Sequence, residues 1–130
     1  MTERLKEDQP IFQQIAELIE TNIIENELKA NDRIPSTNEF AKHYQINPAT
    51  AAKGINLLVD QHIIFKKRGV GMFVTEEAKQ IVLKKRKDQF YDQYVKPMLQ
   101  EAERIELKEE QLSTWIKEAF QNGNESNKLN

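Results

Sequence analysis

The first regular pattern of apolar and polar positions lies near the N-terminus. From Pro10 to Asn26 the apolar residues recur at the i, i+3, i+4, i+7 and i+11 spacing that places them on one face of an α-helix. They are Phe12, Ile15, Ala16, Ile19 and Ile23. We expect later helices to pack on this apolar face. Glu17, Glu20 and Glu25 are expected to face solvent on the same helix.

Residues 36–61 predict two short helices joined by a tight turn. Ser36 followed three positions later by Glu39 is a capping box, which marks the start of the first helix. Asn47 is a favourable N-cap for the second, and Pro48 suits its first position, where the missing N–H removes no hydrogen bond. So short a connection makes the helices cross steeply, as in a helix-turn-helix. The inward positions of the first helix are Phe40, Ala41 and Tyr44.

The second of these helices has two distinct faces. Its apolar face consists of Ala51, Ile55, Leu58 and Val59. Its outer face consists of Ala49, Ala52, Lys53 and Asn56. Small side chains allow a helix to enter a groove, and Lys53 and Asn56 are residue types that reach phosphates and base edges. Gly54 has no evident capping role, so we expect it to permit close approach to the preceding helix.

A β-hairpin is predicted after these helices. Apolar, β-prone runs at residues 63–65 and 72–74 flank a Gly-Val-Gly turn. The tip carries Lys66, Lys67 and Arg68, and cations beside glycines can approach a phosphate backbone or a minor groove closely. A hairpin that directly follows a helix-turn-helix is the wing of a winged helix. The alternative is an ordinary solvated hairpin tip.

The rest of the chain predicts two further helices. From Glu76 to about Arg104 there is no glycine, and apolar positions recur, so we expect a long helix that Pro97 either kinks or breaks. A second helix is expected over residues 108–120, with Gly123 as its stop.

These two helices have little surface on which to pack within one chain. They either fold back onto the N-terminal module or pair with a second copy of the chain. We favour a homodimer, because a large aromatic side chain needs a place to be buried and two-fold dimers match palindromic DNA sites. The predicted dimer interface consists of Phe90, Tyr94, Met98, Leu112, Trp115 and Ile116.

Charge is distributed unevenly along the 130 residues, whose net charge is −2. Residues 1–27 carry two basic and seven acidic groups, whereas residues 28–74 carry seven basic and three acidic groups. The predicted DNA-reading module is therefore the basic part of the chain. For DNA binding, this distribution of charge matters more than the net charge of the whole chain. A further run of four cations, residues 84–87, is either a solvated face or a contact to flanking phosphates.

Several classes of function are excluded by composition. The chain has no cysteine, which removes disulfides, thiolate metal sites and cysteine nucleophiles. It has no apolar run of the ~20 residues needed to span a membrane and no signal-peptide pattern, so we expect a cytoplasmic protein. His43 and His62 lack ligand partners at metal spacing, and no phosphate loop or nucleophile motif is present. We expect no catalytic residue, no metal and no cofactor.

Residues 10–75 carry an ordered set of motifs. They are Pro10-Ile11-Phe12-Gln13-Gln14-Ile15, Ile34-Pro35-Ser36, Phe40-Ala41, Ile46-Asn47-Pro48-Ala49-Thr50 and Gly69-Val70-Gly71-Met72-Phe73-Val74. This set resembles the winged-helix domain of GntR-family bacterial transcription regulators. The short two-helix tail and the Asn-Pro-x-Thr opening of the second helix resemble the YtrA-like subfamily, whose members use the tail to dimerise. The sequence departs from the family pattern at Asn38 and Ala52, where many members have arginine, and at Asn31 and His62, where glycine is frequent.

The residues and the resemblance together predict a mainly α protein with a small β-hairpin. Residues 1–75 are expected to form a winged helix-turn-helix DNA-binding domain, residues 76–122 a two-helix dimerisation region, and residues 123–130 a disordered tail. The predicted function is that of a sequence-specific transcriptional regulator, a repressor that binds double-stranded DNA at a palindromic operator as a homodimer. The predicted DNA-binding residues are Ser36, Thr37, Asn38, Asn47, Ala49, Thr50, Lys53, Asn56, Lys67, Arg68 and Gly69. The alternative is a winged-helix protein-interaction module that does not bind DNA.

Overall fold

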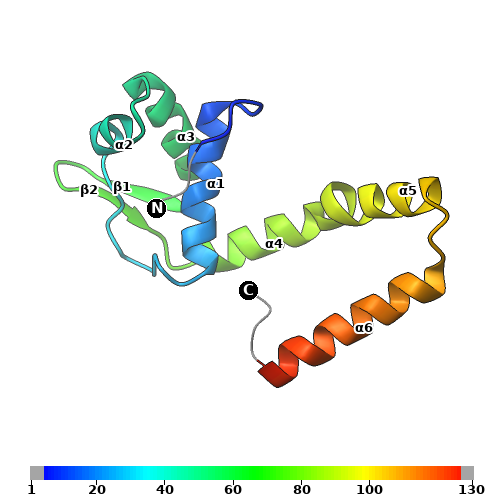
Figure 1. The fold of residues 1–130 in the computed structure, drawn as a ribbon. Helices are drawn as coiled ribbons and strands as arrows, with labels where there is room; N and C mark the ends of the chain where they lie inside the picture. The colour runs from blue at the N-terminus through cyan, green and yellow to red at the C-terminus, as the bar shows by residue number, and fades with distance from the viewer. Residues whose placement is uncertain (1–4, 127–130) are drawn as a thin grey trace. The chain divides into compact units, whose positions relative to one another are not determined.

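The computed structural model describes residues 5–126 and divides into two compact units after Lys87 (Figure 1). The functional boundary predicted after Thr75 therefore lies within the first unit, which also contains the first ten residues of the helix that follows the hairpin. None of the described helices is long and apolar enough to cross a membrane.

The first unit has the element order of a winged helix. It contains α1 (Ile11–Ile24), α2 (Thr37–Tyr44), α3 (Pro48–Asp60), β1 (Ile64–Lys67), β2 (Gly71–Val74) and the first part of α4 (Ala78–Phe90). The predicted capping box at Ser36 and the proline start of α3 are both present. Between α2 and α3, Gln45 has a left-handed backbone conformation, with φ of 56°, and this turns the chain into the second helix.

The core of this unit is made where α1, α2, α3 and the hairpin meet. Its fully buried side chains come from every element, including Ile15 and Ile19 of α1, Phe40 of α2, and Ile55 and Leu58 of α3. The predicted apolar faces of α1 and α3 therefore point into one shared core. Burying such side chains stabilises the fold by about 1.5–3 kcal/mol for each one.

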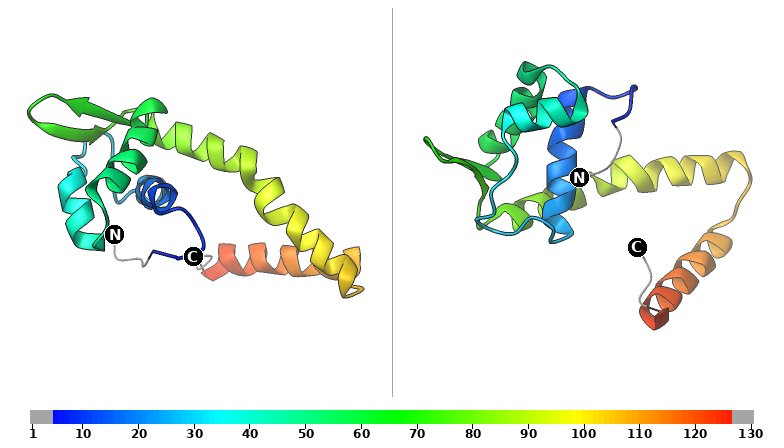
Figure 2. Two further views of the ribbon diagram at one scale, coloured as in Figure 1. Left: turned by 90° about the horizontal axis from the view of Figure 1, so that it is seen from above. Right: turned by 60° about the vertical axis from the view of Figure 1, so that its left-hand side comes forward.

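The two strands form an antiparallel hairpin in which Ile64 pairs with Val74 and Lys67 with Gly71. Arg33 forms a single isolated bridge to Phe73 on the free edge of β2. The backbone N–H of Ile34 donates to the carbonyl oxygen of Met72 at 2.9 Å. The wing projects from the helical part of the unit (Figure 2). The predicted winged helix is thus confirmed.

The second unit is helical. After the end of α4 it contains a π-helical turn η1 (Tyr91–Val95), α5 (Lys96–Arg104) and α6 (Glu109–Ser126). The π turn explains how the chain accommodates Pro97, which cannot donate to the carbonyl of Gln93. The N–H of Lys96 instead reaches back to the carbonyl of Tyr91, and the helix neither ends nor breaks at the proline.

Three local predictions are wrong. Helix α6 continues through Gly123 to Ser126, because a glycine costs only about 1 kcal/mol inside a helix and need not end it. Residues 123–126 of the predicted disordered tail are therefore helical, and residues 127–130 lie outside the described residues. Glu20 is predicted to face solvent, but its side chain is 2% exposed because two cations of α4 cover it.

Gly54 allows close packing, although the helix it approaches is α1 rather than α2. A Cβ atom at this position would lie 2.5 Å from the carbonyl oxygen of Phe12 and 3.1 Å from the Cβ of Ile15. A backbone oxygen cannot move away as a flexible side chain can. The absence of a side chain at residue 54 therefore sets how closely α3 lies on α1.

We predict that Gly54→Ala lowers the free energy of unfolding by about 1–2 kcal/mol. Overpacking typically costs about 1–3 kcal/mol, and the better helix propensity of alanine offsets up to about 1 kcal/mol of that. Urea unfolding followed by circular dichroism would measure the change. Asn56→Ala, at an exposed position two residues later in α3, is the control and should not destabilise the protein. An alanine at 54 that stabilises the fold would contradict the packing argument.

Candidate nucleic-acid interface

The outer face of α3 is exposed and begins at a well-capped helix start. The side-chain oxygen of Asn47 accepts the N–H of Ala49 at 2.7 Å. Ala49, Lys53 and Asn56 are exposed, and Thr50 is partly buried. The described part of the chain thus places the predicted small, cationic and amide side chains on a solvent-facing helix whose first turn carries no acidic residue. Such a helix start attracts phosphate.

Lys53 is held in place by an aromatic ring of α1. Its Nζ lies over the ring of Phe12, 4.0 Å from the ring centroid. A cation–π contact at an exposed site is worth about 0.5–1 kcal/mol, enough to favour one orientation of a long side chain without burying its charge. The sequence pattern placed Lys53 on the outer face but gave no sign of this contact.

The start of α2 brings the Ser36, Thr37 and Asn38 group to the surface. The Oγ of Ser36 already accepts the N–H of Glu39 at 3.1 Å, and the Ser36 N–H donates to the Glu39 carboxylate at 2.8 Å. The side-chain oxygen of Ser36 is therefore engaged in capping, whereas Asn38 is exposed. Of the three residues, Asn38 is the side chain most open to a ligand.

The wing presents its cations at an exposed tip. Lys66, Lys67 and Arg68 are all exposed, and Gly69 has φ of 77°, a conformation that favours glycine. The Nζ of Lys67 lies 5.2 Å from the centroid of the Phe73 ring, which itself stacks on Phe65 at 5.7 Å. The two rings pack on each other across the hairpin, and the charges at the tip remain in solvent.

Arg33 is a basic residue beside the wing that no sequence motif indicated. Its side chain runs along the hairpin turn, so that a Cβ added to Gly71 would lie 2.8 Å from the Arg33 Nε. The residue is exposed. The sequence signal that could have found it is its place immediately before the Ile34-Pro35-Ser36 motif.

The run of cations at residues 84–87 is neither wholly solvated nor wholly open to phosphate. Lys85 Nζ lies 2.7 Å from Glu20 Oε2, and Arg86 Nη2 lies 3.4 Å from Glu20 Oε1. The side chains of Lys85 and Arg86 are 30% and 35% exposed. Half of the run is therefore engaged in ion pairs with α1.

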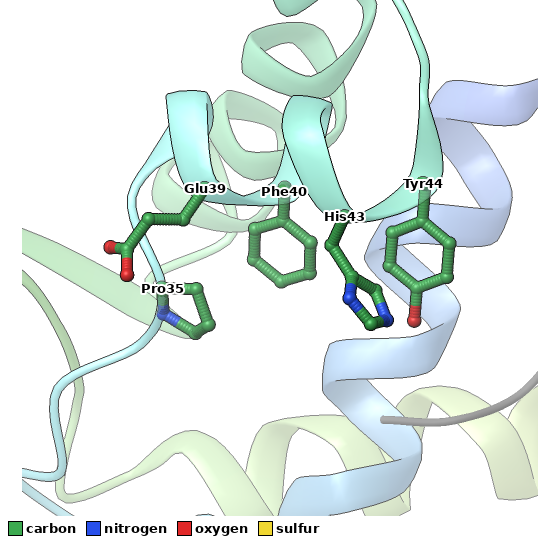
Figure 3. Close-up of a pocket in the computed structure, with 5 residues that line it drawn as sticks. All are labelled: Pro35, Glu39, Phe40, His43 and Tyr44. Carbon is green, nitrogen blue, oxygen red and sulfur yellow. The ribbon is translucent and has the colours of Figure 1, made fainter.

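A hollow of about 350 Å³ lies against α2 and is lined by Pro35, Glu39, Phe40, His43 and Tyr44. Phe40, His43 and Tyr44 point to the same side of the helix (Figure 3). Their rings contact one another, with 6.3 Å between the centroids of Phe40 and Tyr44 and 4.7 Å between those of His43 and Tyr44. The hollow has no lysine or arginine in its lining, so it does not extend the basic surface.

The second unit exposes most of its large apolar side chains. Among the residues predicted for the dimer interface, Phe90 is 54% exposed, Tyr94 62% and Trp115 50%. Met98 and Ile116 are also exposed, and Leu112 is partly buried. Among the side chains described for residues 88–123, Ala102 is the one that is buried. The structure describes no group of acidic, histidine or cysteine residues that could hold a metal ion within residues 5–126.

Comparisons with known proteins point to bacterial transcription regulators. The family model described as bacterial regulatory proteins, gntR family, matches residues 11–74. The uncharacterized HTH-type transcriptional regulator YhcF of Bacillus subtilis is 25% identical over 123 residues, which are 95% of this chain and 100% of YhcF. The HTH-type transcriptional repressor YtrA of Bacillus subtilis is 29% identical over 109 residues, 84% of this chain and 83% of YtrA.

A solved structure extends the likeness to both units. It is a GntR family transcriptional regulator from Listeria monocytogenes, which matches with a TM-score of 0.70 and 25% identity. The match covers 88% of this chain and 98% of that one. The resemblance seen in the motifs of residues 10–75 is thus confirmed by the family model and by the fold.

We predict that the capping box at the start of α2 makes stability depend on pH. The N–H and the hydroxyl of Ser36, together with the nearby charge of Arg33, hold the pKa of Glu39 below its ordinary value of 4.5. A carboxyl whose pKa is lowered by folding stabilises the fold at pH values above the unfolded pKa. That contribution is lost as the pH falls through the lowered pKa.

The measurement compares the wild type with Glu39→Gln by thermal unfolding across this range. The wild type should be the more stable at pH 7, and the difference should disappear as the pH falls from 4.5 through the lowered pKa. Ser36→Ala should cost about 1 kcal/mol at pH 7, because it removes the cap acceptor. A difference between wild type and Glu39→Gln that is independent of pH would refute the ionic part of this account.

Proposed function

Because the chain belongs to the gntR family of bacterial regulatory proteins and is a DNA-binding transcriptional regulator, we propose that it is a repressor that binds a palindromic operator as a homodimer. The observation that carries this proposal is the exposed outer face of α3 beside a basic wing, in a chain whose second unit leaves its large apolar side chains uncovered. A family of DNA-binding regulators favours DNA over a protein partner as the ligand of that face.

In this proposal α3 enters the major groove and its N-terminus faces the DNA. Lys53 and Asn56 are the side chains that read base edges, with Thr50 offering a hydroxyl. Ala49 is small enough to let the helix approach the bases. Asn47 and the start of α2, at Ser36, Thr37 and Asn38, meet phosphates that fix the position of the module.

The wing contributes charge rather than sequence recognition. Lys67, Arg68 and Gly69 lie at an exposed tip, where they meet phosphates or the minor groove. Arg33 lies against the same turn and supports the same contact. Contacts of this kind strengthen binding to all DNA sequences and make it sensitive to salt.

The second unit supplies the dimer. Phe90, Tyr94 and Trp115 each expose half or more of their surface in one chain, although aromatic side chains of this size are usually buried or engaged at interfaces. Pairing two copies through Phe90, Tyr94, Met98, Leu112, Trp115 and Ile116 would cover them. A two-fold dimer then presents two copies of α3 to the two halves of an inverted repeat, as other helix-turn-helix dimers do. YtrA is named a transcriptional repressor, which favours repression over activation.

Selection of bound sequences from random duplex DNA would test the proposal. The expected result is an inverted repeat whose half-sites lie one helical turn apart or a multiple of it. Equal affinity for the selected duplex and a scrambled one would remove sequence-specific recognition. A single unrepeated site bound by a monomer would rule out the proposal that the protein binds as a homodimer.

We predict that mutations in α3 and in the wing weaken DNA binding in different ways. If Lys53 reads a base, Lys53→Ala should cost about 1–3 kcal/mol on the operator and much less on scrambled DNA. Arg68→Ala should weaken binding to both duplexes and reduce the slope of log affinity against log salt by about one unit for each phosphate that is no longer bound. Fluorescence-anisotropy titrations at two salt concentrations measure both effects.

One control and one further variant of the wing accompany these titrations. Lys117→Ala removes an exposed lysine from α6, outside the predicted reading surface, and should leave affinity and salt slope unchanged. Gly69→Ala tests the wing turn, because φ of 77° strains any side chain there. Equal losses for Lys53→Ala on operator and scrambled DNA would show that Lys53 meets phosphate instead of a base.

We predict that Trp115→Ala weakens the dimer at least about tenfold, because truncating a buried aromatic anchor at an interface commonly costs about 2 kcal/mol or more. Sedimentation equilibrium measures the dissociation constant, and circular dichroism confirms that α6 remains folded. Lys117→Ala, two residues along the same helix, should leave the dissociation constant unchanged. A full-length protein that sediments as a monomer at micromolar concentration would rule out the dimer itself.

A further inference from the structure

Glu20 is a buried charge that neither the reading surface nor the dimer contacts use. It lies on α1, and its side chain is 2% exposed. Burying a carboxylate is unfavourable unless cations and hydrogen bonds compensate for the lost water. Both of its oxygens do have partners, and both partners belong to α4: Lys85 at 2.7 Å and Arg86 at 3.4 Å.

The same two cations tie α4 to further groups of the first unit. Lys85 Nζ donates to the side-chain oxygen of Gln61, the C-cap residue of α3, at 3.1 Å. Arg86 Nη2 donates to the Thr21 hydroxyl at 3.0 Å and to the Glu17 carbonyl oxygen at 3.1 Å. One carboxylate of α1 thus organises a network that joins α1, the end of α3 and α4. We call Glu20, Lys85 and Arg86 the α4 anchor.

Apolar packing alone fixes α4 weakly. Its buried side chains are Ala78 and Val82, one of them a single methyl group, and Ile81 and Leu83 are partly buried. Positions 78, 82, 85 and 86 follow the spacing of one helix face, so the α4 anchor extends that contact by one more turn. The α4 anchor lies at the end of the part of α4 that belongs to the first unit, and from Lys87 to Tyr94 every side chain is exposed.

The direction of α4 matters because the predicted dimer residues begin four positions after Arg86, at Phe90. If α4 changes direction at the anchor, the displacement of its later residues grows with their distance from the anchor, and the helix advances about 1.5 Å per residue. In a dimer, the direction of α4 therefore sets the separation of the two copies of α3. Operator half-sites must match that separation, so even a small change in it favours a different spacing.

We propose that Glu20, through Lys85 and Arg86, is a positioning residue that sets the half-site spacing this regulator prefers. This inference rests on the proposed function, because it needs a dimer that binds an inverted repeat. The α4 anchor acts at a distance from the DNA and changes neither the reading face of α3 nor the wing. Its loss should therefore broaden the choice of spacing without weakening the contact of one module with one half-site.

The test measures affinity for a series of duplexes in which the selected inverted repeat is spaced as found, or longer or shorter by one and two base pairs. A duplex with one intact half-site is included. The wild type should prefer one spacing. Glu20→Gln keeps the size of the side chain but removes its charge. It should lose affinity at that spacing by at least about tenfold, because simultaneous engagement of two linked sites is worth about 10²–10⁴-fold.

The spacing profile of Glu20→Gln should also be flatter, and its affinity for the single half-site should equal that of the wild type. Glu17→Gln is the matched control, since it makes the same charge change one turn earlier in α1 at an exposed position. It should keep the wild-type profile. Lys85→Gln is a second variant that leaves the core of α1 intact and should reproduce the flattened profile, so the test does not depend on the folding of Glu20→Gln.

The outcomes separate the two hypotheses. A wild type with a clear spacing preference that both variants retain would overturn the role of the anchor and leave the proposed function intact. An equal loss on the single half-site and on the repeat would also overturn it, because that pattern indicates a destabilised module. A wild type with no spacing preference would instead refute the dimeric operator complex, and the inference with it.

Discussion

The close contact of α3 with α1 at Gly54 is the constraint on which the proposed DNA-reading surface depends. Because residue 54 has no side chain, α3 can lie with its backbone almost against the carbonyl oxygen of Phe12. The residue before the glycine, Lys53, then lies over the Phe12 ring at 4.0 Å. One packing contact therefore determines both how deeply α3 is set into the core and where its cation is held. In the proposed complex, a larger residue at 54 would disturb recognition through geometry, without removing any of the proposed DNA contacts.

A second constraint is electrostatic and acts on α4. The buried carboxylate of Glu20 forms ion pairs with Lys85 and Arg86. Two of the four cations in a run that looks like a basic surface patch in the sequence therefore stabilise the packing of α4 on α1. The side chains of Lys85 and Arg86 are about one-third exposed, so solvent screens their attraction to Glu20 more than it would in a fully buried ion pair. Its specificity is preserved, because the two oxygens of one carboxylate face the side chains of two successive residues.

The sequence predicted the elements well because their signals are local. The capping box of Ser36 and Glu39, the Asn47-Pro48 start and the glycines of the wing each specify a backbone conformation within a few residues. Features that depend on distant residues could not be predicted in this way. Glu20 has the spacing of a solvent-facing residue, and only a helix 65 positions later makes it buried. Likewise, the sequence indicated a close contact at Gly54, but its partner in α1 followed from the tertiary fold.

The site divides in the same manner. Placement of Lys53 and Asn56 on an outer face follows from helical periodicity, whereas the Phe12 contact of Lys53 and the position of Arg33 beside Gly71 require the packed structure.

The two units also differ in how far each buries its own apolar side chains. The first buries side chains from each of its elements in one core, whereas the second leaves Trp115, Tyr94 and Phe90 half exposed or more. A module with its own core can recognise DNA as a rigid body, and a helical unit without one gains most from a partner of the same shape. Helix α4 belongs to both units, so in the proposed dimer its anchoring would couple assembly to DNA recognition.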